Sequence, residues 1–261
     1  MICREHEGNL VMIKQHDHGQ LSGKLAEHFR SEQVPEPARR TEVLRAICNH
    51  DRGWIDLDET PFWNDAEGAP YTFIDFPIVP KLTFYAKGLD EIESDSPYGA
   101  LLCSLHYERL IEVSGEDQPE LTLYLEREEE RRGRIRRDLE QSAPIGEAEL
   151  YYDTKLLQFC DDLSLYMALN EPGSPKSEEH PWWKDGFSGS EDFGFTEGRV
   201  ITAEWKDANT LMLDPFPFTE SFEIALPMRN VPKSKVEADG IARAYRDAPE
   251  QIYKISLTVK S

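Results

Sequence analysis

The feature that most constrains the fold is the adjacent pair His50-Asp51, which stands at the end of an apolar helical pattern. This pattern has the i, i+3, i+4, i+7 spacing of one helix face, in Leu44, Ile47, Cys48 and Asp51. The spacing predicts that Asp51 projects into the core, where an uncompensated carboxylate is strongly disfavoured and metal coordination removes the cost. We therefore predict a metal site centred on this pair. The alternative is that the apolar face ends one turn earlier, which would leave both side chains solvated before Gly53.

Two further histidines lie on apolar faces of other predicted helices. His18 stands three positions before Leu21, at the start of an apolar pattern with i+4 spacing. His106 falls on the apolar side of a helix predicted to begin near residue 95. His16 is either another ligand or a helix cap. A single inward histidine is more often a hydrogen-bonded core residue than a ligand, so the partners of these side chains decide their role.

Two adjacent aspartates lie in the middle of a helix predicted over residues 148–169. Asp161 neighbours Leu157 and Ser164 on the helical wheel, so it is predicted to point inward, and Asp162 is the better candidate for solvent. Ligands on four helical segments can meet only inside a bundle. Imidazole and carboxylate ligands without thiolate suit Mn, Fe, Zn, Ni or Mg, as one or two ions. The five predicted ligands are His18, His50, Asp51, His106 and Asp161.

The rest of the chain supports a helical part followed by strands. Residues 54–80 are rich in aromatics and proline without a regular period, which predicts a long loop that is functional, packed by its own aromatics, or both. Residues 80–88 and about 116–141 read as further helices. Strands are predicted at 9–13, 199–205, 211–213, 222–226 and 252–259.

The net charge of the chain limits which partners it can bind, and the spacing of its cysteines gives no zinc-binding motif. The 50 acidic and 29 basic residues give a net charge of -21, which opposes nucleic acid and anionic membrane surfaces. A small anionic substrate would need a local positive centre, which a bound divalent ion supplies. The four cysteines are widely spaced, without a CxxC motif. With neither a signal peptide nor a long apolar run, we expect a cytoplasmic protein.

The order and spacing of the predicted ligands resemble the HD superfamily of metal-dependent phosphohydrolases. In that superfamily a first His is followed by a His-Asp pair, in some members by further His residues, and by a distal Asp. Here His18 precedes His50-Asp51 by 32 positions (50 − 18), His106 would be the additional ligand of two-metal members, and Asp161 the distal Asp. The chain also resembles an uncharacterised bacterial family, in residues 15–18, 21–23, 49–54, 104–106 and 161–165.

The resemblance implies an HD-like helical bundle, and the strand patterns predict a C-terminal antiparallel β-rich appendage, so the expected fold class is mostly α. Residues 1–170 would form the helical metal-binding domain, with residues 1–14 a strand that joins the C-terminal sheet. Residues 171–198 would be a linker or draped loop, and residues 199–261 the β-rich region. This sequence has Arg52-Gly53-Trp54 where HD hydrolases have an adjacent His pair or Gly-Lys, and this departure leaves the substrate class and the number of ions open.

Three functions are consistent with the sequence. The first is a metal-dependent hydrolase of a small phosphoester or nucleotide-like substrate, with Asp51 and His106 as catalytic residues and Arg52 and Trp54 as substrate-binding residues. The second is an HD-like di-iron oxygenase, for which His16 or Asp17 would be a sixth ligand. The third is a non-catalytic metal- or ligand-binding scaffold. We expect a small-molecule partner and no binding to nucleic acid or to a membrane. Self-association as a homo-oligomer is a further possibility.

Overall fold

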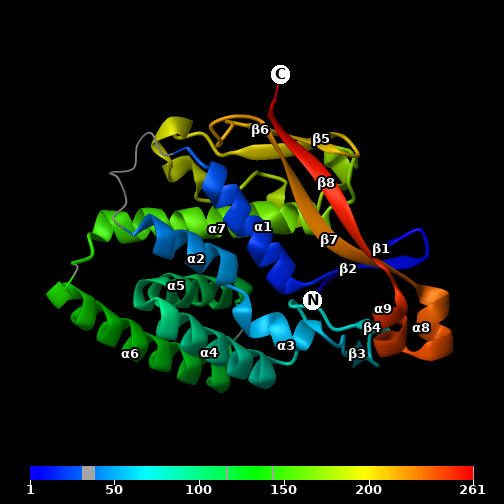
Figure 1. Cartoon of the computed structure of the whole chain (residues 1–261), viewed down its shortest axis with the longest axis horizontal. Helices are drawn as coiled ribbons and strands as arrows, with labels where there is room; N and C mark the ends of the chain where they lie inside the picture. Colours follow the sequence, from blue (N-terminus) through cyan, green and yellow to red (C-terminus); the bar gives the residue numbers. More distant parts are fainter. Residues whose placement is uncertain (31–38, 116, 143, 261) are drawn as a thin grey trace.

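The computed structural model describes residues 1–30, 39–115, 117–142 and 144–260. Strands from both ends of the chain form one sheet of six strands, in the order β1-β2-β7-β8-β6-β5 (Figure 1). All neighbouring strands in this sheet are antiparallel except β6 and β8, which are parallel. A separate two-stranded sheet pairs β3 with β4. The strands are β1 (Ile2–His6), β2 (Asn9–Ile13), β3 (Trp63–Asn64), β4 (Ala69–Pro70), β5 (Thr202–Asp207), β6 (Thr210–Asp214), β7 (Phe222–Pro232) and β8 (Glu250–Val259).

In the described part of the chain, seven helices lie between β2 and β5, and two short ones connect β7 to β8. The helices are α1 (Gln15–His28), α2 (Arg40–Asn49), α3 (Ile55–Asp58), α4 (Ile78–Asp95), α5 (Pro97–Ser114), α6 (Pro119–Ser142), α7 (Glu147–Leu169), α8 (Lys233–Asp239) and α9 (Ile241–Asp247). Short 3-10 turns include η1 (Arg52–Trp54) and four more between residues 176 and 196. Among the described residues, no helix combines the length and apolar character that crossing a membrane requires.

The predicted fold class is wrong. The molecule is not a mostly helical HD-like bundle with a β appendage but an α/β fold, in which a large mixed sheet is an integral layer. The predicted N-terminal strand is present, and β2 pairs with β7 in the register Leu10 to Val231. One continuous core joins the two layers, because Ile13 and Leu257 of the sheet belong to the same apolar cluster as Leu157 of α7. The predicted division into domains at residue 170 stays a prediction.

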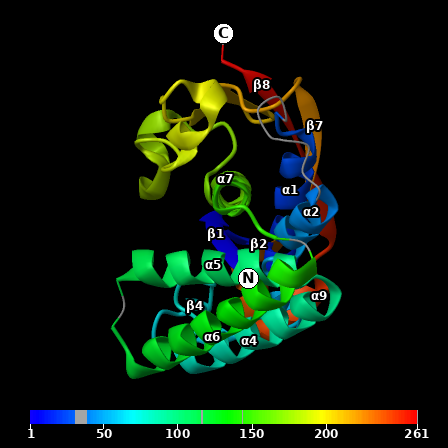
Figure 2. The same cartoon turned by 90° about the vertical axis from the view of Figure 1, so that its left-hand side faces the viewer.

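Helix α7 lies in the middle of the helical layer. It contacts the helices α1, α2 and α5 and the strand β1. Figure 2 views α7 end on, with α1 and α2 beside it and α5 on another side. Helix α1 also packs on β7, so it lies between the sheet and α7. The helices that carry His18 and His106 therefore both contact the helix that carries Asp161.

Glycines allow two close approaches that shape this region. A Cβ atom at Gly23 of α1 would lie 2.0 Å from the sulfur of Cys48 in α2. A Cβ at Gly53 would lie 2.3 Å from the carbonyl oxygen of Phe84 in α4, and Gly88 of α4 faces Gly53 in turn. Larger residues at these positions would push α2 and the turn after it away from α1 and α4.

The stretch predicted as a long loop holds more structure than expected. It contains η1, α3 and the β3–β4 pair, and α4 begins at Ile78 and continues to Asp95, beyond the predicted end at residue 88. The ring of Phe76 lies 5.5 Å from Trp54 and 5.8 Å from Phe62, both edge to face. The aromatic residues of this stretch thus pack on one another, as one of the two interpretations predicted.

Candidate metal centre

Five predicted ligands meet inside the helical layer. α1 carries His18, α5 carries His106, and α7 carries Asp161. His50 and Asp51 directly follow α2. All five side chains are buried, with exposed fractions between 0% and 6%. This burial excludes the alternative in which His50 and Asp51 are solvated.

The backbone at the His-Asp pair differs from the prediction. α2 ends at Asn49, and Asp51 has φ −97° and ψ 22°, outside the helix. The helical spacing therefore correctly predicts that Asp51 points into the core, but wrongly predicts that its backbone is helical. The chain turns here because η1 begins at Arg52, where Gly53 packs against the backbone of α4.

Asp161 lies between three imidazoles. Its Oδ1 atom is 2.9 Å from Nε2 of His18 and 3.2 Å from Nε2 of His50, whereas its Oδ2 atom is 3.5 Å from Nε2 of His106. The Oδ2 atom of Asp51 is 3.4 Å from Nε2 of His18 and 3.6 Å from Nε2 of His50. The imidazoles of His18 and His50 thus each lie near both carboxylates, and His106 faces the other oxygen of Asp161. Two groups could hold an ion: His18 with His50 and Asp51, and His50 with His106 and Asp161.

These separations are close to those between neighbouring donor atoms around one ion. Ligand bonds of about 2.0–2.2 Å in a tetrahedral site place neighbouring donor atoms about 3.3–3.6 Å apart. The two separations between the imidazoles of His18 and His50 and Asp51 are 3.4 and 3.6 Å, within this range, and those to Asp161 are shorter, at 2.9 and 3.2 Å. The Nε2 atoms of His18 and His50 are buried and make no well-formed hydrogen bond within the described part of the chain. The residues present could hold a metal ion.

Hydrogen bonds behind the site direct the two imidazoles toward that point. Nδ1 of His50 donates to the carbonyl oxygen of Ile47 at 2.8 Å, since a carbonyl can only accept. Nδ1 of His18 hydrogen-bonds with Oγ of Ser164, and Oγ of Ser22 lies 3.0 Å from Oγ of Ser164. With each proton on Nδ1, the lone pair of each Nε2 faces the two carboxylates.

Other side chains hold the turn that carries the His-Asp pair. Nε2 of Gln15 donates to Oδ2 of Asp51 at 3.1 Å. The hydroxyl of Tyr107 donates to the carbonyl oxygen of His50. Tyr107 in turn stacks on Tyr85, with ring centroids 4.1 Å apart and planes 4° from parallel. The position of the pair is therefore fixed from α1, α4 and α5.

Replacing Ser164 with alanine is expected to weaken metal binding about 10- to 100-fold, the usual effect of losing an outer-shell partner. The reason is that Nδ1 of His18 would lose its hydrogen-bond partner, and the ring would no longer be held in one orientation. Competition with a chelator of known affinity measures the change. Thr154→Ala serves as the control, because its hydroxyl bonds only the carbonyl oxygen of Leu150 in the same helix. An unchanged affinity in Ser164→Ala would contradict the orientation argument.

Without an ion, the two central imidazoles act as the cations of the site. Burial lowers the pKa of His18 and of His50, but the carboxylates of Asp51 and Asp161 outweigh burial and raise both, to about 9 for His50. Burial raises the pKa of Asp161, yet the imidazoles hold it well below its ordinary value. Burial dominates at His106 and lowers its pKa to about 4. A divalent ion that displaced one proton each from His18 and His50 would leave the net charge of the site nearly unchanged.

The remaining predicted site residues lie around this centre rather than in it. Arg52 is half-buried and pairs with Glu91 through its Nε atom. Trp54 is 1% exposed and packs in the aromatic core against Phe76 and Tyr85. Its role in substrate binding stays a prediction.

Three residues that the sequence left undecided are also placed. The backbone NH of His16 donates to Asp58, while its ring is half-buried and Nδ1 has no partner among the described residues. Asp17 is half-buried, and burial raises its pKa to about 6. Asp162 is not solvated but half-buried, 3.6 Å from the guanidinium of Arg109.

Sequence reasoning missed the residues that orient the ligands. Ser22 stands four positions after His18 on α1, and Ser164 stands three after Asp161 on α7. Both were visible as small polar residues on otherwise apolar helix faces next to a predicted ligand. Gln15 and Tyr107 gave no comparable signal, because their partners are on other elements.

Fold and site together define an α/β protein with a buried histidine and aspartate centre that could hold a metal ion. Residues 1–233 match the family described as "Protein of unknown function (DUF3891)", so the chain belongs to that family. No curated protein and no solved structure matches the chain. The comparisons thus place it in an uncharacterised family and do not place it in the HD superfamily.

Proposed function

We propose that the protein is a metal-dependent hydrolase of a small phosphoester. The observation that carries the proposal is the arrangement of His18, His50, Asp51 and Asp161, in which each imidazole lies 2.9–3.6 Å from both carboxylates. The order of these ligands along the chain, which resembles that of HD phosphohydrolases, also supports it. An ion bound there would lower the pKa of a coordinated water and polarise a phosphoryl oxygen.

The chain itself would orient and assist that chemistry. Gln15 holds Asp51, and Ser164 holds His18, so the ligand atoms are fixed before substrate arrives. Because burial lowers the pKa of His106 to about 4, this imidazole is neutral near pH 7. It would either bind a second ion together with Oδ2 of Asp161 or accept a proton. A neutral imidazole is suited to both of these roles and less suited to the role of general acid.

We assign recognition of the phosphate to Arg52. Burial lowers the pKa of His16, and the charge of Arg52 contributes to the same shift, which indicates that the guanidinium is near the first turn of α1. Arg52 directly follows the His-Asp pair, and only its Nε atom is engaged by Glu91. Its terminal nitrogens would remain for the paired recognition of phosphate oxygens. Trp54 is buried.

The test is phosphate release from a panel of phosphomonoesters and phosphodiesters by the metal-reconstituted protein. We expect activity in the wild type, and a loss of at least about tenfold in kcat/KM for Arg52→Gln without a change in metal content. Arg45→Gln is the matched control, because Arg45 is exposed and pairs with Asp95 on the surface. Metal-loaded protein that hydrolyses none of the panel would refute the proposal and favour the non-catalytic scaffold.

One observation favours a second candidate, a di-iron oxygenase. The two oxygens of Asp161 face different imidazoles, with His18 and His50 on one side and His106 on the other. A carboxylate in this position is suited to bridging two ions, and His50, His106 and Asp161 form a second group that could hold one. Bound iron with substrate-dependent oxygen consumption, and no phosphate release, would support this candidate over the hydrolase.

A further inference from the structure

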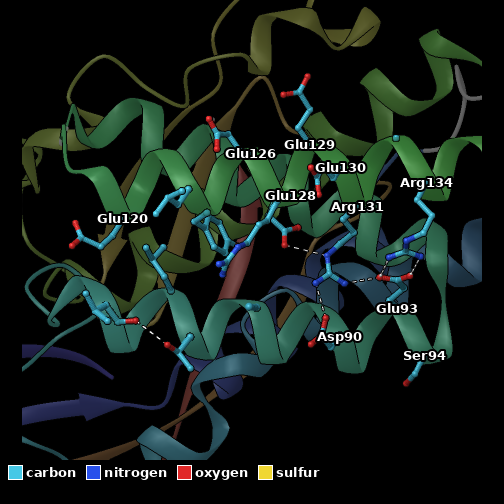
Figure 3. A pocket seen from close by; sticks show the side chains of 18 of the residues that line it. Asp90, Glu93, Ser94, Glu120, Glu126, Glu128, Glu129, Glu130, Arg131 and Arg134 are labelled. Carbon is cyan, nitrogen blue, oxygen red and sulfur yellow. Dashed lines mark hydrogen bonds and ion pairs between the residues drawn. The ribbon is translucent and has the colours of Figure 1, made fainter.

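Two surface features lie apart from the metal centre. One is the groove between α4 and α6, which Arg131 of α6 spans to reach Asp90 and Glu93 of α4 (Figure 3). Because these three charges are paired within the chain, they indicate no ligand. The other feature is an edge of the six-stranded sheet, at the beginning of β8.

Strand β6 lies beside only the last residues of β8. The first register pair between these two strands is Thr210 with Ser256, whereas β8 begins at Glu250 and pairs with β7 from that residue onward (Figure 1). Within the described part of the chain, residues 250–254 of β8 therefore have no neighbouring strand on the β6 side. We call these five residues the β8 edge.

The backbone of the β8 edge faces this open side. The NH of Ser256 donates to the carbonyl oxygen of Asn209 at 2.8 Å, and Nδ2 of Asn209 donates to the carbonyl oxygen of Lys254 at 3.2 Å. Since alternate residues of a strand direct their NH and CO groups to the same side, those of Ile252 also face away from β7. Pro227, which has no NH to donate, is opposite Ile252 in β7, as expected where two backbones do not bond each other.

The side chains of the β8 edge are open to solvent on one face of the strand. Glu250, Ile252 and Lys254 share that face because successive side chains of a strand alternate, and all three are exposed, Ile252 by 56%. An unpaired edge with an exposed apolar side chain is a place where another strand can pair. Charges on an edge oppose most such pairings, so their signs and positions decide which strand fits.

The charges of the β8 edge are complementary to those of the same edge in a second copy. In an antiparallel pair centred on Ile252, the two isoleucines lie opposite each other. Glu250 stands two positions before Ile252 and Lys254 two positions after it, so each acid faces a lysine of the other copy. Opposite charges in facing positions stabilise a strand pair, and like charges destabilise it. Registers shifted by two residues leave these charges without an opposite partner.

We propose that the β8 edge joins two copies of this chain into a two-fold symmetric dimer. Backbone hydrogen bonds between the two Ile252 residues continue the sheet of one copy into the other. The facing pairs of Glu250 and Lys254 fix the register, and the two-fold axis makes each of these contacts occur twice. The interface is independent of the metal centre and of the proposed hydrolase.

The test is sedimentation equilibrium of the full chain over about 10 µM to 1 mM, because an interface of one short strand pair is small and associates weakly. Salt at about 0.15 M screens the long-range repulsion between two chains of net charge -21. We expect a monomer–dimer equilibrium that Ile252→Lys weakens at least about tenfold, since two ammonium groups would then face each other. Val259→Lys is the matched control, because Val259 is also 56% exposed on β8 but lies beside β6.

Exchange of the charges tests the register itself. Glu250→Lys and Lys254→Glu are each expected to weaken dimerisation at least about tenfold, because each replaces both opposite-charge pairs with like-charge pairs. An equimolar mixture of the two variants is expected to dimerise nearly as well as the wild type, since the mixed dimer again has opposite charges at both positions. Within the chain, Lys254 pairs with Glu223 and Glu250 lies near Arg229. Mixing does not restore these pairs, so they cannot account for a recovery.

Three results would overturn the proposal. These are a wild-type protein that stays monomeric up to about 1 mM, a dimer that Ile252→Lys leaves unchanged, and a mixture of the two charge variants that associates no better than either alone. All the substituted side chains are exposed, and circular dichroism of each variant verifies the fold before sedimentation.

Discussion

Replacing Asp161 with asparagine is expected to produce the largest loss of metal affinity of any single change, more than about 100-fold and so above the effect of an outer-shell partner. Asp161 is the only described residue whose carboxylate faces three imidazoles, those of His18, His50 and His106. The amide keeps the shape of the carboxylate but removes its charge. Two protonated imidazoles would then share only Asp51 in the metal-free protein.

The same substitution is expected to lower the stability of the metal-free protein by about 3–5 kcal/mol, the usual cost of removing one partner from a buried ionic cluster. Chelator competition and urea unfolding measure the two effects. Asp153→Asn is the matched control, because Asp153 is equally buried on α7 and accepts from Tyr98, a bond that an amide oxygen preserves. Near-normal metal affinity in Asp161→Asn would contradict the assignment of Asp161 as a central ligand.

The stabilisation gained from the metal is expected to increase from pH 6.5 to pH 8.5. In the metal-free protein, burial lowers the pKa of His50. The charge of Asp51 and the contact with Asp161 outweigh burial and raise the pKa from 6.5 to about 9. The stabilising contribution of this protonated imidazole is complete below about pH 6.5 and is lost as the pH rises toward 9. Each pKa unit corresponds to about 1.4 kcal/mol, so the loss over this interval is on the order of 2 kcal/mol.

A bound ion removes that dependence, because the coordinated Nε2 atom of His50 carries no proton to lose. Thermal unfolding with and without metal, at several pH values, measures the difference between the two forms. His28→Gln is the control, since His28 stacks on Phe222 away from the centre and should leave the difference unchanged. A metal effect that is constant or decreases with pH would contradict the predicted competition between metal and protons.

Much of the candidate centre could be predicted from local sequence patterns. Helical periodicity alone places His18, His106 and Asp161 on inward faces, because each lies within three or four positions of core residues on its own helix. The structure brings these side chains together with the His50-Asp51 pair. Whether they bind metal stays a prediction, since proximity shows a possible site and not its occupant.

The sheet could not be predicted to the same extent because its pairing is not local. β2 and β7 are neighbours although Leu10 and Val231 are far apart in the sequence, and no periodicity within either strand specifies that register. The parallel pairing of β6 with β8 is similarly non-local, because β7, α8 and α9 separate the two strands along the chain although Leu211 and Leu257 are register partners. The sequence therefore predicts the strands, and an N-terminal strand in the C-terminal sheet, but not that this sheet is an integral layer of an α/β fold.

The most direct test of the account is the metal content of the purified protein, measured by elemental analysis after reconstitution with Mn, Fe, Zn, Ni or Mg in turn. We predict about one or two ions per chain, lost in Asp51→Ala and retained in His28→Ala. His28 provides the matched control because it lies on α1, as His18 does, but stacks on Phe222. A wild-type protein that holds no ion under any of these conditions would contradict the metal centre and the functions proposed from it.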